Sequence, residues 1–357
     1  MIKLTINHRV VEVEAGSTIL QAAKKLGVFI PTFCADDLER LPAKHCADCN
    51  EHDCRMCSCE VEGESELLTA CNTPAREGMV VWTESEKVKN TRIAILQKML
   101  SIHPLDCMNC GKLGDCKLQK YCEMYGLQEP AYIQPFEHRE KDMSNRFYFQ
   151  EMDKCIRCGK CVQVCRELVG VNALTMVKKG DMTYMMPNGG KTMAETKCVS
   201  CGNCVSVCPV GALMPKSQQF FRQWETQKVT TTCSYCGVGC QIEYSVRNGK
   251  IVDAKPANGP SNQGLLCVKG KFAFDFINHK DRLKYPMIRK NGKLVRASWN
   301  EALNLVAKNI LAVKNEYGPD AIAGFSSART TNEDNYLFQK FMRAAVGTNN
   351  VDHCARL

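Results

Sequence analysis

The chain has 357 residues, of which 24 are cysteine and 45% are hydrophobic. Its 47 basic and 38 acidic side chains give a formal charge of +9, a balance that by itself indicates an acidic partner, nucleic acid or a membrane surface. The length predicts roughly two or three domains. No apolar run of the sequence is long enough to cross a bilayer, which excludes a membrane span.

The first residues alternate between apolar and polar side chains as a strand does, without a signal peptide or a twin-arginine pair. We therefore expect a cytoplasmic protein, in which clustered cysteines bind metal rather than form disulfides. Nineteen cysteines and one histidine fall into five groups with metal-ligand spacing. Five iron-sulfur clusters with their thiolates contribute roughly −9 of charge, so the basic balance gives no argument for nucleic acid.

Residues 1–80 are predicted to form a plant-type 2Fe-2S ferredoxin domain. Strands over 2–6 and 10–14 precede a helix over 17–26, for which Ser17 is available as the cap. An early cysteine, a CxxC pair and a later cysteine follow, as in ferredoxins of this type. The predicted ligands are Cys34, Cys54, Cys57 and Cys71.

Spacing alone leaves a second CxxC pair in this domain, Cys46 and Cys49. We prefer Cys54 and Cys57 because a strand over 58–62 follows them directly. The other pair is interpreted as part of an insertion, either redox-active or simply exposed. Cys59 alternates with the strand and is expected to be a buried structural thiol.

Residues 81–125 carry a helix over 88–100 and then a histidine followed by three cysteines. A lone histidine is ordinarily a surface or core residue, and that interpretation holds for His8, His45, His52, His138 and His279. His103 differs because three residues separate it from a CxxC pair. The predicted ligands of a 4Fe-4S cluster are His103, Cys107, Cys110 and Cys116.

An imidazole ligand makes such a cluster less negative than four thiolates do, which changes its potential. Zinc is the competing metal for one histidine and three cysteines. The neighbouring ferredoxin modules favour iron and sulfide. Cys122 is left over and is interpreted as structural.

Residues 140–220 contain the bacterial ferredoxin run twice, which is the most specific signal in the chain. The fourth cysteine of each run serves the other cluster. The two predicted sets are Cys155, Cys158, Cys161 with Cys208, and Cys198, Cys201, Cys204 with Cys165. Arg166 replaces the usual proline after the first run and leaves the ligands intact. Residues 168–193 between the runs read as an insertion with a turn at Asn188.

The fifth group lies within residues 226–285. A CxxCxxxC motif is followed, after a strand-rich segment, by one distant cysteine. A zinc ribbon would have two CxxC pairs, so the three-residue second gap favours a 4Fe-4S cluster. Its predicted ligands are Cys233, Cys236, Cys240 and Cys267.

Residues 286–357 are predicted to begin an α/β domain. An amphipathic helix over 299–317, a buried strand over 321–325 and a helix over 332–346 follow one another. This pattern has no partner sheet, so we expect the domain to be incomplete at Leu357.

The segment Gly264-Leu-Leu-Cys267-Val-Lys269-Gly270, with the cysteine motif before it, resembles the N-terminal part of molybdopterin-dependent oxidoreductases, above all formate dehydrogenases. Residues 326–336 and 347–357 resemble the same enzymes. The resemblance implies an α+β multidomain fold: a β-grasp 2Fe-2S ferredoxin, a His-Cys 4Fe-4S domain, a two-cluster ferredoxin and the start of the molybdopterin oxidoreductase α/β fold.

Two other families share the first three modules, namely the large iron-sulfur subunit of respiratory complex I and the iron-only hydrogenases. A hydrogenase would continue with its own cysteine motif, whereas complex I subunits often keep the fifth cluster over a degenerate pterin domain. The ending 349–357 favours the cytoplasmic formate dehydrogenase catalytic subunit.

That resemblance implies oxidation of formate to carbon dioxide, or the reverse, at a molybdenum or tungsten bis-molybdopterin guanine dinucleotide. Electrons would pass singly through one 2Fe-2S and four 4Fe-4S clusters to an iron-sulfur flavin subunit that reduces NAD(P), or to ferredoxin or a hydrogenase. Lys269 would lie between the last cluster and the pterin. Without the resemblance, Lys269 would be interpreted as an ordinary solvated lysine. The sequence distinguishes neither the metal nor the acceptor.

In formate dehydrogenases the residue after Leu357 is the selenocysteine or cysteine that contacts the metal, so no catalytic residue is predicted within the chain. We interpret the end of the chain at Leu357 as the result of an in-frame UGA codon that was read as a stop. The alternative is that the chain is a natural, short electron-transfer subunit. The 357-residue chain alone is expected to be inactive with formate. His353 and Arg356 are candidates for lining the formate site, and Cys354 is expected to be a buried structural thiol.

Overall fold

The computed structural model describes residues 1–35, 54–135, 138–179, 182–217 and 221–354. The chain divides into two compact units, Met1–Gln227 and Lys228–Leu357. Among the described residues, none of the helices combines the length and the apolar character that a bilayer span requires. Cys46, Cys49, His45, His52 and Arg356 lie outside the described residues.

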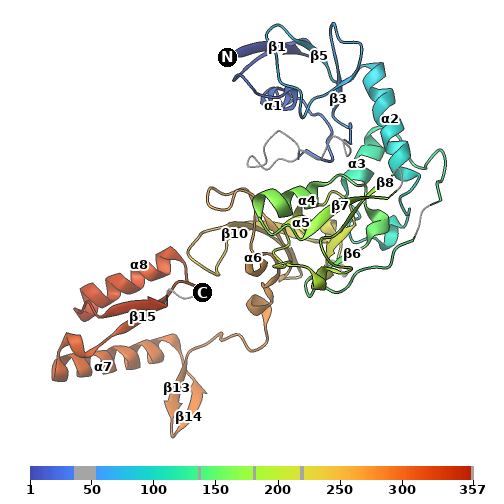
Figure 1. The fold of residues 1–357 in the computed structure, drawn as a ribbon. Coiled ribbons are helices and arrows are strands. Elements are labelled where there is room, and N and C mark those ends of the chain that lie inside the picture. Colours follow the sequence, from blue (N-terminus) through green and yellow to red (C-terminus); the bar gives the residue numbers. More distant parts are fainter. Residues whose placement is uncertain (36–53, 136–137, 180–181, 218–220, 355–357) are drawn as a thin grey trace. The chain divides into compact units, whose positions relative to one another are not determined.

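The first unit begins with a five-stranded mixed sheet in the order β2-β1-β5-β3-β4 (Figure 1). Its strands are β1 (Ile2–Ile6), β2 (Arg9–Val13), β3 (Ser58–Val61), β4 (Leu68–Thr69) and β5 (Val80–Trp82). β1 pairs antiparallel with β2 and parallel with β5. The turn between β1 and β2 has Asn7 and His8 at positive φ, as the favoured two-residue hairpin turn requires.

Helix α1 (Ile19–Lys25) packs against this sheet, and Ile19, Ala22 and Ala23 belong to the hydrophobic core between them. The predicted cap at Ser17 is wrong, because Thr18 is the N-cap. The Gln21 amide donates to Thr18 Oγ1 (3.2 Å) and the Thr18 amide donates to Gln21 Oε1 (2.8 Å). This reciprocal capping box satisfies two amides that a serine one residue earlier would leave unpaired.

The His-Cys module contains α2 (Glu86–Leu100), a short turn η2 (Cys107–Asn109) and α3 (Lys117–Met124). Its long helix begins two residues before the predicted start, and Ser85 caps it. Every fourth position from 88 to 100 is buried, which turns one face of α2 towards β3 and α3. The buried residues are Val88, Arg92, Leu96 and Leu100.

The two-cluster module shows its internal repeat in the backbone as well as in the sequence. α4 (Lys160–Gln163), continued by η4 (Val164–Leu168), and α5 (Asn203–Val207) each start after a glycine at positive φ, Gly159 or Gly202. β6 (Tyr148–Gln150) pairs with β9 (Leu213–Pro215), and the predicted insertion contains the hairpin β7 (Leu174–Lys179) and β8 (Met182–Pro187). Short helical turns are η3 (Met152–Lys154), η5 (Met193–Glu195) and η7 (Gln223–Glu225).

The second unit starts with a three-stranded sheet of β10 (Gln227–Thr232), β11 (Gln241–Arg247) and β12 (Lys250–Pro256). Its small core includes Ile242, Tyr244 and Phe274. α6 (Val268–Phe272) and η8 (Asp275–Asn278) follow, and β13 (Met287–Lys290) with β14 (Lys293–Arg296) forms a hairpin.

The last segment is a βαβ arrangement preceded by a helix. It contains α7 (Trp299–Tyr317), η9 (Pro319–Ala321), β15 (Gly324–Ser327), α8 (Asn332–Lys340), η10 (Phe341–Val346) and β16 (Val351–Cys354). β15 and β16 pair in parallel. The predicted helix 299–317 is confirmed, but the strand begins at Gly324 rather than Ala321, because Pro319 and the two residues after it form a helical turn.

Two predicted burials in this segment are wrong. Phe325 is 79% exposed and Cys354 is also exposed. Both lie in the two-stranded β15/β16 sheet, and within the described residues the side chains of these two positions are not covered.

Candidate iron-sulfur sites

The predicted 2Fe-2S ligands meet as two close pairs of thiols. Cys34 Sγ lies 3.3 Å from Cys54 Sγ, and Cys57 Sγ lies 3.2 Å from Cys71 Sγ. Hydrogen bonds with Cys34 and Cys57, together with burial, raise the pKa of Cys71 far above its ordinary value, so the two pairs also contact each other. Two adjacent pairs fit a 2Fe-2S cluster, in which each iron takes two protein thiolates.

The thiol of Cys59 belongs to the core beneath this loop. The residue is fully buried, and its Sγ donates to the Leu68 carbonyl at 3.4 Å across β3 and β4. Burial raises the pKa of Cys59 to about 12, which keeps it protonated at neutral pH. These observations agree with a structural thiol.

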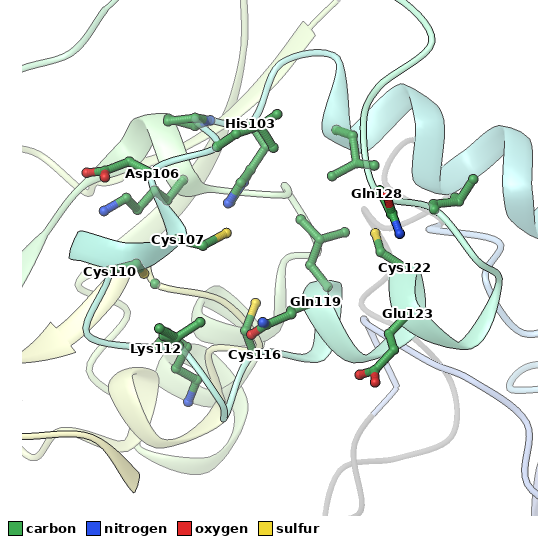
Figure 2. A pocket seen from close by; sticks show the side chains of 18 of the residues that line it. His103, Asp106, Cys107, Cys110, Lys112, Cys116, Gln119, Cys122, Glu123 and Gln128 are labelled. Carbon is green, nitrogen blue, oxygen red and sulfur yellow. The ribbon is translucent and has the colours of Figure 1, made fainter. Parts of the chain in front are cut away.

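The His-Cys group surrounds a cavity of about 490 Å³, shown in Figure 2. His103, Cys107, Cys110 and Cys116 line it together with Cys122. His103 Nδ1 is buried and has no hydrogen-bond partner. Burial, followed by the positive charge of Lys154, lowers the pKa of His103 to about 4. At neutral pH this imidazole is therefore in the uncharged form that binds metals, and a buried nitrogen without a partner fits a ligand.

The volume of the cavity suits a cluster better than a single zinc ion. A zinc ion would need its four donors about 2.3 Å or less from a single centre. A 4Fe-4S cluster instead takes each ligand on a different iron, which suits donors spread around a cavity.

Three other histidines among the described residues have ordinary environments. His8 packs edge-on against Trp82, with ring centroids 4.5 Å apart, and His138 Nδ1 contacts the Asp153 carboxylate. His279 is exposed. Cys122, although it faces the cavity, is buried, and burial raises its pKa to about 11.

In the two-cluster module, the structure brings the fourth cysteine of each run to the other run. Cys208 lines a small cavity of about 20 Å³ together with the first three cysteines of the first run, namely Cys155, Cys158 and Cys161. Burial raises the pKa of Cys155 to about 11. Burial also raises the pKa of Cys204, and the next causes are the nearby sulfurs of Cys201, Cys198 and Cys165.

Backbone amides point at several of these sulfurs. The Arg157 amide donates to Cys155 Sγ (3.4 Å), and the Ser200 amide donates to Cys198 Sγ (3.3 Å). Arg157 and Ser200 both have positive φ and occupy equivalent places in the two runs. Hydrogen bonds to cluster sulfurs are one of the means by which a protein sets cluster potential.

The fifth set is gathered between β10 and α6. Burial raises the pKa of Cys240, and the next causes are the nearby sulfurs of Cys233, Cys236 and Cys267. Asn262 shapes the loop: its Oδ1 accepts from the Gln241 amide (2.9 Å) and its Nδ2 donates to the Leu265 carbonyl (3.0 Å). Lys269 is exposed on α6, in the turn that follows Cys267.

Sequence reasoning missed two lysines beside the His-Cys cavity, of which Lys154 is buried and Lys112 is half-buried. Lys154 forms an ion pair with Glu151 (2.7 Å), and Lys112 forms one with Asp115 (3.0 Å); both lysines line the His-Cys cavity. Gly211 is there too, with no room for a β-carbon beside Cys110 Sγ. A cluster with thiolate ligands would be negative, and the part of the lysine charge that the carboxylates do not cancel would offset it.

Five family models match successive parts of the chain. Residues 1–86 match a 2Fe-2S iron-sulfur cluster binding domain, 92–131 the NADH-ubiquinone oxidoreductase-G iron-sulfur binding region, and 154–212 a 4Fe-4S dicluster domain. Residues 226–279 match the molybdopterin oxidoreductase Fe4S4 domain, and 282–357 match molybdopterin oxidoreductase. The chain joins iron-sulfur cluster binding domains to the start of a molybdopterin oxidoreductase domain. The predicted fold class and order of domains are confirmed.

Relatives of this chain carry different names. The "NADPH-Fe(3+) oxidoreductase subunit alpha" of Geobacter sulfurreducens is 39% identical over all of the chain and 40% of its own length. A relative from Rhizobium meliloti, named as part of an NADH-quinone oxidoreductase, is 40% identical, with the same coverage. The "Putative formate dehydrogenase YrhE" of Bacillus subtilis is 33% identical over 99% of the chain and 40% of its own length.

The chain therefore spans about 40% of the length of these relatives. A solved structure, the NAD+-reducing [NiFe]-hydrogenase in the H2-reduced state, is similar with a TM-score of 0.53 and 25% identity. The similarity covers 60% of this chain and 87% of that one.

Proposed function

We propose that the chain conducts electrons, through one 2Fe-2S and four 4Fe-4S clusters, between a molybdopterin site and a partner subunit that exchanges electrons with NAD(P). The observation that carries this proposal is the convergence of five separate donor sets, one of which includes the buried, partnerless Nδ1 of His103. The proposed modules are residues 1–80, 81–125, 140–220, 226–285 and 286–357. Each of the five predicted ligand sets is assigned to one cluster.

Bound iron-sulfur clusters supply one-electron chemistry. The chain itself holds the donors and places charged groups around them. Burial keeps the imidazole of His103 neutral, while Lys112 and Lys154 place positive charge beside the same cavity. Backbone amides donate to Cys155 and Cys198.

For the whole protein we propose the oxidation of formate to carbon dioxide, which releases one proton and two electrons, or its reversal. A molybdenum or tungsten bis-molybdopterin guanine dinucleotide would be the cofactor. The resemblance of residues 349–357 to formate dehydrogenases and the name of the Bacillus subtilis relative support this substrate. The exposed Lys269, close in sequence to Cys267, is proposed to contact the pterin, and His353 and Arg356 are proposed to line the formate site.

A second candidate is the oxidation of NADPH with delivery of electrons to ferric iron, without formate. Its support is the higher identity to the Geobacter sulfurreducens relative, 39% against 33% for the relative named as a formate dehydrogenase. Under this proposal the electrons enter at the partner subunit rather than at the pterin domain.

The two candidates predict different reductants. The protein would be isolated without oxygen, together with its partner subunits, and mixed with formate or with NADPH while cluster reduction is followed by absorbance and electron paramagnetic resonance. We expect formate to reduce the clusters. Cys233→Ala removes a proposed ligand of the fifth cluster. In this variant formate should no longer reduce the four N-terminal clusters, whereas NADPH should still reduce them. Reduction by NADPH alone, with formate inactive towards the unaltered protein, would replace the first candidate by the second.

A further inference from the structure

Arg92 is an arginine buried against the loop of the 2Fe-2S site. It lies in the middle of α2, its side chain is fully buried, and it is the largest of the fully buried side chains among the described residues. Nε donates to the Met56 carbonyl (3.1 Å) and Nη2 donates to the Ser58 carbonyl (2.9 Å). These carbonyls flank Cys57, so the guanidinium fixes both sides of one proposed ligand.

The same guanidinium reaches two further groups. Nη1 donates to Glu84 Oε1 (2.6 Å) and to the Tyr125 hydroxyl (2.8 Å). Glu84 precedes α2, and Tyr125 ends α3 in the His-Cys module. Arg92 thus joins the cluster loop of the first module to the module that follows, where α2 packs beside β3 and α3 (Figure 1).

The local charge is asymmetric. The Glu84 side chain is 48% exposed, whereas the Arg92 side chain is 0% exposed. Water therefore screens the carboxylate more than the guanidinium, and a positive field remains on the buried side, where the guanidinium contacts the carbonyls on either side of Cys57. Adding an electron makes a 2Fe-2S cluster more negative, and a buried cation nearby favours that state.

We propose that Arg92 is a positioning residue that holds the 2Fe-2S loop in place and raises the reduction potential of its cluster. This inference rests on the proposed function, because it needs a cluster at Cys34, Cys54, Cys57 and Cys71. It concerns neither formate nor NAD(P). A guanidinium can serve four acceptors at once in a fixed plane, which an ammonium cannot.

The test is a potential titration of the whole protein with chemical reductants, followed by electron paramagnetic resonance. Arg92→Gln should shift the midpoint of the 2Fe-2S cluster to a more negative potential and leave the 4Fe-4S midpoints unchanged. Arg92→Lys keeps the charge and should shift the 2Fe-2S midpoint less. Arg76→Gln is the matched control, because Arg76 forms an exposed ion pair with Glu64 (2.6 Å) in the same domain. This variant should leave the midpoint potential of the 2Fe-2S cluster unchanged.

Glu84→Gln provides a second, opposite measurement that retains Arg92. Removing the counter-charge should move the 2Fe-2S midpoint to a more positive potential, so the proposal stays testable even where Arg92→Gln loses the cluster. An unchanged midpoint in Glu84→Gln, or equal shifts in Arg92→Gln and Arg92→Lys, would overturn it. Absence of a 2Fe-2S signal from the unaltered protein would instead contradict the proposed function.

Discussion

Gly211 offers a sharp test of how the His-Cys site is packed. A β-carbon added at this position would lie 2.5 Å from Cys110 Sγ and 3.5 Å from Lys154 Cδ. Non-bonded heavy atoms in contact normally lie about 3.5–4.0 Å apart, so Gly211→Ala must displace the Cys110 sulfur or the backbone by about 1 Å. We expect a loss of stability of about 1–3 kcal/mol, the usual cost of overpacking.

The displaced atom is a proposed ligand, so the variant should lose a specific cluster as well as stability. We expect Gly211→Ala to lack the electron paramagnetic resonance signal of the His-Cys cluster and to contain less iron per chain. Gly189→Ala is the control: with φ at +79° and no atom within 4 Å of the new β-carbon, it should cost about 1–2 kcal/mol through backbone strain while every cluster stays. Full iron content and an unaltered signal in Gly211→Ala would refute the reasoning.

Three other predictions test separate parts of the chain. Cys208→Ser should remove the cluster of the first ferredoxin run and Cys165→Ser that of the second, as judged by iron content and electron paramagnetic resonance; loss of the cluster in the same run would contradict the crossed ligands. Lys271 and Asp253 are a buried pair, both 2% exposed and 3.5 Å apart, so Lys271→Met should cost about 3–5 kcal/mol in chemical denaturation, with partial recovery in the double variant that adds Asp253→Asn. Equal stability of Lys271→Met and the unaltered protein would count against this. Thr18→Ala should cost about 1 kcal/mol in thermal melting while Ser17→Ala costs little, because Thr18 is the cap; the reverse order would show that the cap is misassigned.

The cysteine groups could be read from the sequence because ligand spacing is a local property. The CxxC segments place their sulfurs together whatever surrounds them, and the crossing of Cys208 follows from the repeat. Helix 299–317 was equally predictable from its period and its serine cap. The capping threonine could have been found from the Thr18 to Gln21 spacing, which is that of a capping box.

The buried charges could not be predicted. Arg92 and Lys271 look like solvated residues in their local sequence, and their partners are set by contacts between elements far apart in the chain. The partner of Lys154 is local, but its burial beside the His-Cys cavity is a tertiary feature. The same dependence explains the error at Phe325. A β-branched or aromatic residue in a strand is covered only when another element packs over it, and strand pattern does not reveal which face that element covers.

The crossed arrangement of the two ferredoxin runs has a consequence for biosynthesis. As the chain leaves the ribosome, the proposed donors of the 2Fe-2S site are complete at Cys71 and those of the His-Cys site at Cys116. The first ferredoxin run must wait, because its fourth donor is Cys208, and by then the donors of the second run are complete as well. Insertion of these two clusters is therefore expected to be a joint event that follows synthesis of the whole module, with Cys155, Cys158 and Cys161 left vulnerable to oxygen until then.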